Sequence, residues 1–195
     1  SLNKKLVIAF LFIFMLGSFG LYIIDKAARS RIDNISILGK VPSFSLINFD
    51  GSTITEKQLN DKISIVNFMF TQCEGACPIM SENISILQDR FAMSEEIQFL
   101  SITTDPDFDS LEALSKYSDN YSNKDNWLFL RGDIIDIIKL SEKGFFLDAK
   151  LLPAGHSLNF VLVDKELNIR KFYKGDEDSN IIELQHDIVT LLNKG

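Results

Sequence analysis

The chain has 195 residues, of which 46% are hydrophobic and 24% are charged, and this is enough for one ordinary domain plus a short additional segment. With only 4 prolines and 10 glycines, the composition excludes disordered, collagen-like and linker-rich architectures. The net charge of −7 argues against nucleic-acid binding, because binding a polyanion requires clustered lysine and arginine.

The first predicted element is a membrane-spanning helix over residues 6–24. These residues carry no charge, and at about 1.5 Å per residue they nearly span a hydrocarbon core of about 30 Å. A cleaved signal peptide is the competing interpretation, but its apolar part is usually shorter and Ala27-Ala28 is a poor cleavage site. Basic residues flank both ends, so the positive-inside rule does not decide the orientation. We therefore expect residues 1–24 to be an uncleaved anchor and residues 25–40 to be a polar stalk.

Residues 41–195 are predicted to form a single α/β domain. A short strand before the Asp50-Gly51 turn indicates a hairpin, and near-continuous apolar runs at 63–70 and 97–103 are typical of buried strands. The remaining pattern predicts helices at about 78–91, 109–117, 133–143 and 179–192 and strands at 127–130, 158–163 and 169–173. Alternating strands and helices followed by an antiparallel hairpin imply a mixed central sheet with helices on both faces.

Cys73 and Cys77, the two cysteines of the chain, lie between a predicted buried strand and a predicted helix, where sites form in such sheets. Pro78 suits the first helical turn, so Cys77 is expected at or next to the helix N-cap, where amide dipoles lower a thiol pKa. The spacing allows either a disulfide or a shared metal, and two thiolates suit Cu(I) or Zn. Two inert buried cysteines, or a purely structural disulfide, are the alternatives. We favour a functional pair.

The stretch from Phe70 to Pro78 resembles the signature of the Sco/SenC family. These are membrane-anchored, thioredoxin-like, copper-binding proteins that take part in assembling the copper centre of cytochrome c oxidase. The resemblance covers roughly residues 41–195, and further matching segments are Val41–Leu46, Asp50-Gly51, Leu100–Pro106, Trp127–Gly132, Gly155–Ser157 and Phe160–Asp164. It implies a thioredoxin-like fold after one transmembrane helix, and copper, as Cu(I) or Cu(II), as the bound metal.

The resemblance also implies a ligand set. Cys73 and Cys77 would be the thiolate ligands and His156 the imidazole ligand. The residues alone support His156 less strongly, because a lone histidine in a loop is more often a surface residue. His186 is expected to face solvent from the last helix and is assigned no role.

Four acidic residues have roles that the sequence pattern or the resemblance predicts. Asp105 ends a buried strand, and the resemblance implies a place near the copper site, in partner contact or in tuning the ligands. A turn or cap is its alternative role. Asp107 and Asp109 are expected to be solvated or capping, and Asp109 with Glu112 is a candidate capping box.

Three functions are compatible with these residues. The first is a copper-handling assembly factor that is not an enzyme, and for it the resemblance implies the copper-bearing subunit of cytochrome c oxidase and other copper carriers as partners. The second is a thiol–disulfide oxidoreductase that uses Cys73 as nucleophile and Cys77 as resolving thiol, and that reduces the cysteines of the apo copper site or other extracytoplasmic thiols. A peroxidase is least favoured, because Phe70 stands where a peroxiredoxin has Thr or Ser. The domain is expected outside the cytoplasm, in the bacterial periplasm or the mitochondrial intermembrane space.

Overall fold

The computed structural model describes residues 2–33, 35–122, 125–150, 152–153 and 155–193. The chain divides into two compact units, Ser1–Ser36 and Ile37–Gly195, and each is described separately.

The first unit contains one helix, α1 (Leu2–Asp33). Its segment Leu6–Ile24 is long and apolar enough to cross a membrane, a criterion that a signal sequence also meets. The hydroxyl of Ser18 donates a hydrogen bond to the carbonyl of Phe14 at 2.9 Å, which satisfies the most polar side chain of the segment within the helix itself. The helix continues beyond the apolar segment, so the predicted stalk is helical as far as Asp33 and ends in the first strand of the second unit.

The second unit contains each helix and strand that the sequence pattern predicts. The strands are β1 (Gly39–Lys40), β2 (Ser45–Asn48), β3 (Thr53–Thr55), β4 (Ile63–Met69), β5 (Ile97–Thr103), β6 (Trp127–Arg131), β7 (Asn159–Val163) and β8 (Asn168–Lys174). The helices are α2 (Ala76–Arg90), α3 (Leu111–Tyr121), α4 (Ile134–Lys139) and α5 (Asp178–Leu192), with a 3₁₀ turn η1 (Glu56–Leu59) and a π-helical turn η2 (Leu140–Gly144).

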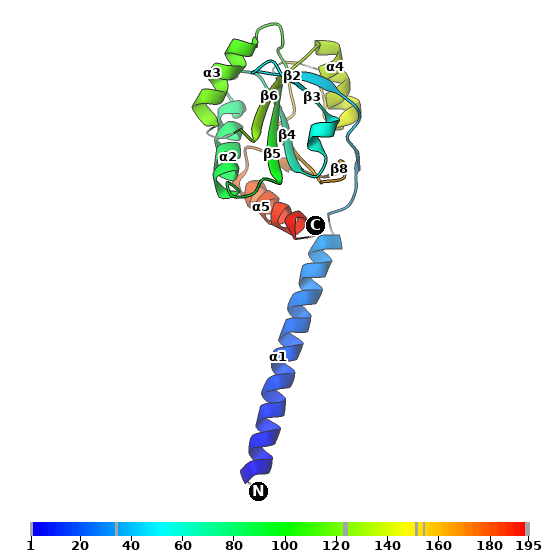
Figure 1. The fold of residues 1–195 in the computed structure, drawn as a ribbon, viewed down its shortest axis with the longest axis vertical. Coiled ribbons are helices and arrows are strands. Elements are labelled where there is room, and N and C mark those ends of the chain that lie inside the picture. Colours follow the sequence, from blue (N-terminus) through cyan, green and yellow to red (C-terminus); the bar gives the residue numbers. More distant parts are fainter. Residues whose placement is uncertain (1, 34, 123–124, 151, 154, 194–195) are drawn as a thin grey trace. The chain divides into compact units, whose positions relative to one another are not determined.

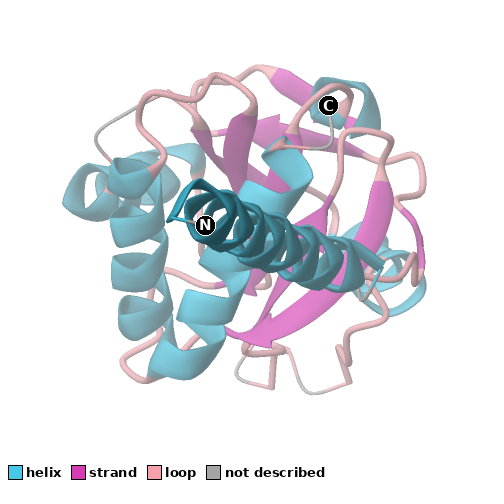
Figure 2. Cartoon of the chain, turned by 90° about the horizontal axis from the view of Figure 1, so that it is seen from below, coloured by secondary structure: helices cyan, strands magenta, loops and turns pink. Residues whose placement is uncertain are grey.

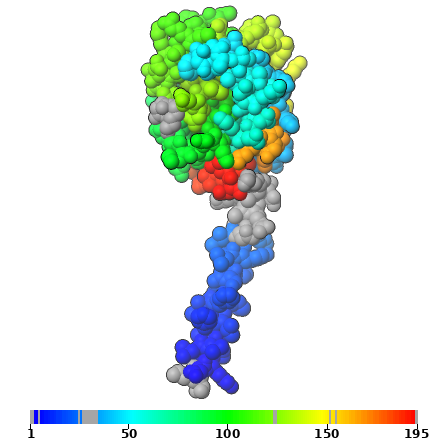
Figure 3. Space-filling view, viewed as in Figure 1, coloured from blue at the N-terminus to red at the C-terminus, as the bar shows by residue number. Residues whose placement is uncertain are grey.

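The strands form one sheet in the order β1-β8-β7-β4-β5-β6-β2-β3. Strands β4, β5 and β6 are parallel, whereas β7 runs antiparallel to β4, so the sheet is mixed as predicted. Figure 2 shows the strands gathered in the centre of the domain with helices around them. The turn before β4 and the turn after β7 are joined by a hydrogen bond, in which the N–H of Asp61 donates to the carbonyl of Lys165 at 3.0 Å. The two segments adjoin in Figure 3, in cyan and orange.

Helices cover both faces of the sheet, and this explains why every residue of β4 and β5 is buried. On one face Ile65 and its neighbours pack against α2, α3 and α5, through side chains such as Met80 and Leu184. On the other face Val66 and Phe68 pack in a second core that includes residues of α4 and η2. Each fully buried aliphatic side chain stabilises the folded state by about 1.5–3 kcal/mol relative to the same side chain exposed to water. Figure 1 shows α2 and α3 on one side of the strands and α4 on the other.

The predicted capping box at the start of α3 is wrong. Ser110 is the N-cap, and its hydroxyl accepts a hydrogen bond from the N–H of Ala113 at 3.1 Å. Asp109 is fully buried, because its carboxylate binds threonine donors inside the domain instead of the end of the helix. Asp107 is exposed, as expected.

Candidate metal centre

The topology brings two distant loops to one edge of the sheet. The first loop follows β4 and leads into α2, and it carries Cys73 at its centre. The second loop leads into β7 and carries His156. Because β7 is antiparallel to β4, with Val66 opposite Val161, the start of β7 lies at the same edge as the end of β4. This places His156 beside the cysteines although 79 positions separate it from Cys77.

Cys73, Cys77 and His156 form a compact cluster. Their donor atoms, two Sγ and one imidazole nitrogen, all lie within 4.8 Å of one another. Nε2 of His156 lies 3.2 Å from Sγ of Cys77. With metal–sulfur bonds of about 2.3 Å, three donors around one metal lie roughly 4 Å apart, so the cluster has to contract by less than about 1 Å to hold an ion. Thiolate and imidazole donors also suit the soft and borderline ions Cu(I) and Zn(II).

The orientation of the imidazole leaves one nitrogen available. Nδ1 of His156 lies 3.1 Å from the carbonyl oxygen of Ser157, and a carbonyl can only accept, so Nδ1 carries the hydrogen. Nε2 therefore carries the lone pair, which accepts a hydrogen bond from the thiol of Cys77 in the absence of a metal. The ring of Phe70 packs edge-on against the imidazole, with centroids 5.7 Å apart and an interplanar angle of 85°. The histidine side chain is thus fixed from two sides in a ligating geometry.

Burial distinguishes the two cysteines. Cys77 is the second residue of α2 and is 1% exposed, whereas Cys73 is partly exposed, so reagents and partners reach Cys73 first. Burial, followed by a hydrogen bond with Cys73, raises the pKa of the Cys77 thiol to about 12. The expectation that the helix N-terminus would lower this pKa is therefore wrong, because desolvation outweighs the helix dipole. Burial lowers the pKa of His156, which keeps the imidazole neutral.

The other predicted positions lie outside this cluster. Among the described residues, Asp105 is not one of the three that group around a common point, and its backbone N–H donates to the hydroxyl of Thr103 at 3.0 Å. His186 is exposed on α5, as expected. The sequence reasoning missed Asp109, whose buried carboxylate binds Thr71, two residues before Cys73. No pattern in a single sequence links residues 38 positions apart.

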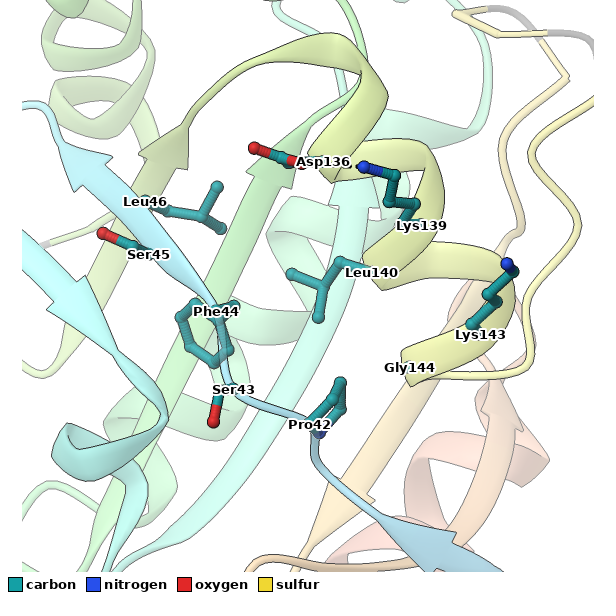
Figure 4. Close-up of a pocket in the computed structure, with 10 residues that line it drawn as sticks. All are labelled: Pro42, Ser43, Phe44, Ser45, Leu46, Asp136, Lys139, Leu140, Lys143 and Gly144. Carbon is teal, nitrogen blue, oxygen red and sulfur yellow. Dashed lines mark hydrogen bonds and ion pairs between the residues drawn. The ribbon is translucent and has the colours of Figure 1, made fainter.

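A cavity of about 550 Å³ lies elsewhere, between the segment Pro42–Leu46 and the α4–η2 region. In Figure 4, Phe44 and Leu46 on one wall and Leu140 on the other line it, and lysines lie on the helical wall. Leu46 and Leu140 belong to the core on the α4 face, whereas Cys77 belongs to the opposite core. This cavity is therefore separate from the cysteine–histidine cluster.

Comparison with known proteins identifies the family. A family model described as SCO1/SenC matches residues 38–193. The chain belongs to the SCO1/SenC family. The curated SCO1 protein homolog of Bacillus subtilis is 29% identical over 157 residues, which are 76% of this chain and 81% of the relative. The SCO1 homolog 1 of Arabidopsis thaliana is 25% identical over 190 residues, which are 87% of this chain and 57% of the relative.

Solved SCO1/SenC structures share the fold. The structure of BsSco, described as a member of the Sco family of cytochrome c oxidase assembly proteins with a disulfide switch, matches with a TM-score of 0.72 at 26% identity, over 82% of this chain and 98% of that chain. The copper-bound ScoI of Arabidopsis thaliana matches with a TM-score of 0.67 at 24% identity, over 82% and 100% of the two chains. The thioredoxin-like fold predicted from the resemblance is confirmed.

Proposed function

We propose that this protein binds one copper ion through Cys73, Cys77 and His156, and that it assists assembly of the copper centre of cytochrome c oxidase. The observation that carries the proposal is the convergence of two thiols and one oriented imidazole within 4.8 Å, in a member of the SCO1/SenC family. A bound copper ion would be held by two soft thiolates and one imidazole, a set that favours Cu(I) and also binds Cu(II). The partly exposed Cys73 provides the side from which copper enters and leaves.

In this proposal the three copper ligands and the nearby Asp105 have distinct roles. Cys77 and His156 are buried and fixed, so they define the position of the ion. Cys73 lies in the loop before α2, where its backbone N–H bonds the carbonyl of Phe70 at 3.2 Å, and it can exchange copper with a partner's donor atoms. Asp105, near this edge of the sheet, is proposed to contact the partner or to tune the ligands.

Copper titration tests the ligand set. The reduced full chain in detergent is titrated with Cu(I) under anaerobic conditions, alongside Cys73→Ser, His156→Ala and the matched control His186→Ala. We expect one copper per chain, loss of affinity by more than tenfold (about 1.4 kcal/mol) for the first two variants, and wild-type affinity for the control. Wild-type affinity in Cys73→Ser would show that the proposed site is wrong.

A thiol–disulfide oxidoreductase is the second candidate function, favoured by the pairing of a partly exposed cysteine with a buried one. Cys73 as thiolate would attack a partner disulfide, and Cys77 would then attack the mixed disulfide. The partner leaves as a dithiol, and this chain keeps the Cys73–Cys77 disulfide and needs a dithiol reductant to reset. A pKa of about 12 leaves little Cys77 thiolate at neutral pH, which slows the second step. The two functions are compatible, because only the reduced pair binds metal.

We also propose the division of the chain and its location. Residues 1–24 form the anchor, residues 25–40 the link and residues 41–195 the copper domain, with the domain in the bacterial periplasm or the mitochondrial intermembrane space. Support comes from the apolar segment Leu6–Ile24 and from the fit of a cycling dithiol to an oxidising compartment. The chain should resist carbonate extraction from membranes. A reporter fused after Gly195 that is active only in the cytoplasm would overturn the placement of the domain outside the cytoplasm.

A further inference from the structure

We infer that the loop between β5 and α3, which carries no metal ligand, holds both ligand-bearing loops in place, and that Asp109 is its principal positioning residue. The inference rests on the proposed copper function for its consequence, but the geometry stands independently of any metal. Because β5 is parallel to β4, with Met69 opposite Thr103, its loop emerges at the same edge of the sheet as the cysteine loop.

Asp109 is attached to the cysteine loop by a group of hydrogen bonds. One carboxylate oxygen accepts from the backbone N–H of Thr71 at 3.1 Å, and the other accepts from the Thr71 hydroxyl. The hydroxyl of Thr103 donates to the same carboxylate. Asp109 is 0% exposed and has no ion-pair partner among the described residues, so these donors are what offsets its buried charge. The start of the cysteine loop is therefore bound to a rigid strand end.

The rest of the β5–α3 loop is itself fixed. The backbone N–H of Asp109 donates to the carbonyl of Asp105 at 2.8 Å, and Arg131 on β6 donates from Nη2 to the carbonyl of Pro106 at 2.7 Å. The neighbouring Thr104 connects to the histidine loop. Its N–H donates to the carbonyl of Met69 at 2.7 Å, and its hydroxyl lies within hydrogen-bond distance of the carbonyls of both Met69 and Pro153. One loop thus contacts both the loop that carries Cys73 and leads into α2 with Cys77, and the loop that carries His156.

Asp109→Asn is the sharpest change, because it conserves shape and removes the charge. An amide has one acceptor oxygen, and its NH₂ group would face the hydroxyl and N–H donors that the carboxylate now accepts from. We expect copper affinity to fall by about tenfold to hundredfold, as for other groups that orient metal ligands. In the metal-free protein we expect a faster alkylation of Cys73 and a shifted reduction potential of the Cys73–Cys77 pair. A purely structural role would lower only the thermal unfolding temperature.

Two further variants complete the experiment. Thr71→Val removes one hydroxyl of the same cluster, and in a double-mutant cycle Thr71→Val/Asp109→Asn should be no worse than Asp109→Asn alone. If Asp109→Asn fails to fold, Thr71→Val tests the same cluster by the same measurements. Asp164→Asn is the matched control. Asp164 is also buried, at 3% exposed, but it follows β7 at the opposite ends of the strands, so the Asp164→Asn variant should change stability without changing copper affinity, alkylation or potential.

The outcomes separate the two proposals. If wild-type protein binds no copper, the proposed function fails, while the alkylation rate and the reduction potential still decide the role of Asp109. If Asp109→Asn folds and matches wild type within about threefold in affinity and alkylation, with an unchanged potential, the inference is overturned. Independent, additive effects of the Thr71 and Asp109 changes would equally contradict a shared cluster.

Discussion

Copper binding should release the proton of Cys77, and this follows directly from the burial of that side chain. The pKa of about 12 lies about five pH units above neutrality, so forming the thiolate at pH 7 costs about 7 kcal/mol, which the metal–sulfur bond must offset. The raised pKa means that Cys77 is protonated over the whole working range. Protons therefore compete with copper, and the apparent affinity should rise with pH.

The apparent copper affinity should rise tenfold per pH unit for each proton that copper binding releases. Cys77 alone should increase the Cu(I) affinity about 100-fold between pH 6 and pH 8. His156 adds no proton near neutral pH, because its pKa is lowered by burial and the imidazole is already neutral there. Competition against a chromophoric chelator, corrected for the chelator's own pH dependence, measures the slope. Calorimetry in two buffers of different ionisation enthalpy counts the protons.

Cys77→Ala supplies the internal comparison, since its slope should be one proton smaller than that of wild type. A wild-type slope clearly below one proton per copper would refute the reasoning. Either Cys77 would then not be a ligand, or its thiol would be ionised before copper arrives.

Three other predictions concern redox state and stability. Air-oxidised metal-free protein should contain a Cys73–Cys77 disulfide and bind no copper until reduced; thiols that alkylate equally before and after reductant would contradict this. Gly175→Ala should lower the urea-unfolding free energy by about 1–3 kcal/mol, because a Cβ there would lie 2.9 Å from the ring of Phe160, and an unchanged midpoint would refute it. Burial alone would raise the pKa of Asp164, but hydrogen bonds from Arg170, Asn168 and backbone N–H groups outweigh it and hold the pKa below its ordinary value. The stabilisation is then present above the ordinary carboxyl pKa and is lost as the pH falls through the lowered one, so wild type and Asp164→Asn should converge in stability below about pH 4.

The fold was predictable because its signals are local. The buried strands β4 and β5 are continuous apolar runs, and α5 shows apolar residues at helical spacing, so their types follow from period and length. The extension of α1 to Asp33 was missed, because charged residues after the apolar segment form helix as readily as they form a stalk. The π-helical turn after α4 was also missed, since nothing in Leu140–Gly144 distinguishes it from a further α-helical turn.

The site was only partly predictable, because its contacts are not local. The cysteines were visible as a pair within one loop, but His156 depended on a family resemblance. Asp109 was assigned to a helix cap, which is the usual task of Asp before a helix. Thr103 at the end of β5 and Thr71 in the loop after β4 bind the carboxylate instead, and burying it among these three donors also satisfies the N–H of Thr71.

The same non-local burial has a consequence for copper transfer in the proposed function. Holding the Cys77 thiol away from water stabilises its protonated form, so the copper-free state is favoured relative to a site whose thiols ionise freely. Copper would therefore move from this protein to an acceptor whose ligands cost less free energy to deprotonate. Cys73, the accessible donor, would be the last ligand to dissociate from the ion. The burial of Cys77 thus lowers the affinity for copper, and the exposure of Cys73 raises the rate at which copper is transferred. A carrier needs both, because a site built to bind as tightly as possible would keep its cargo.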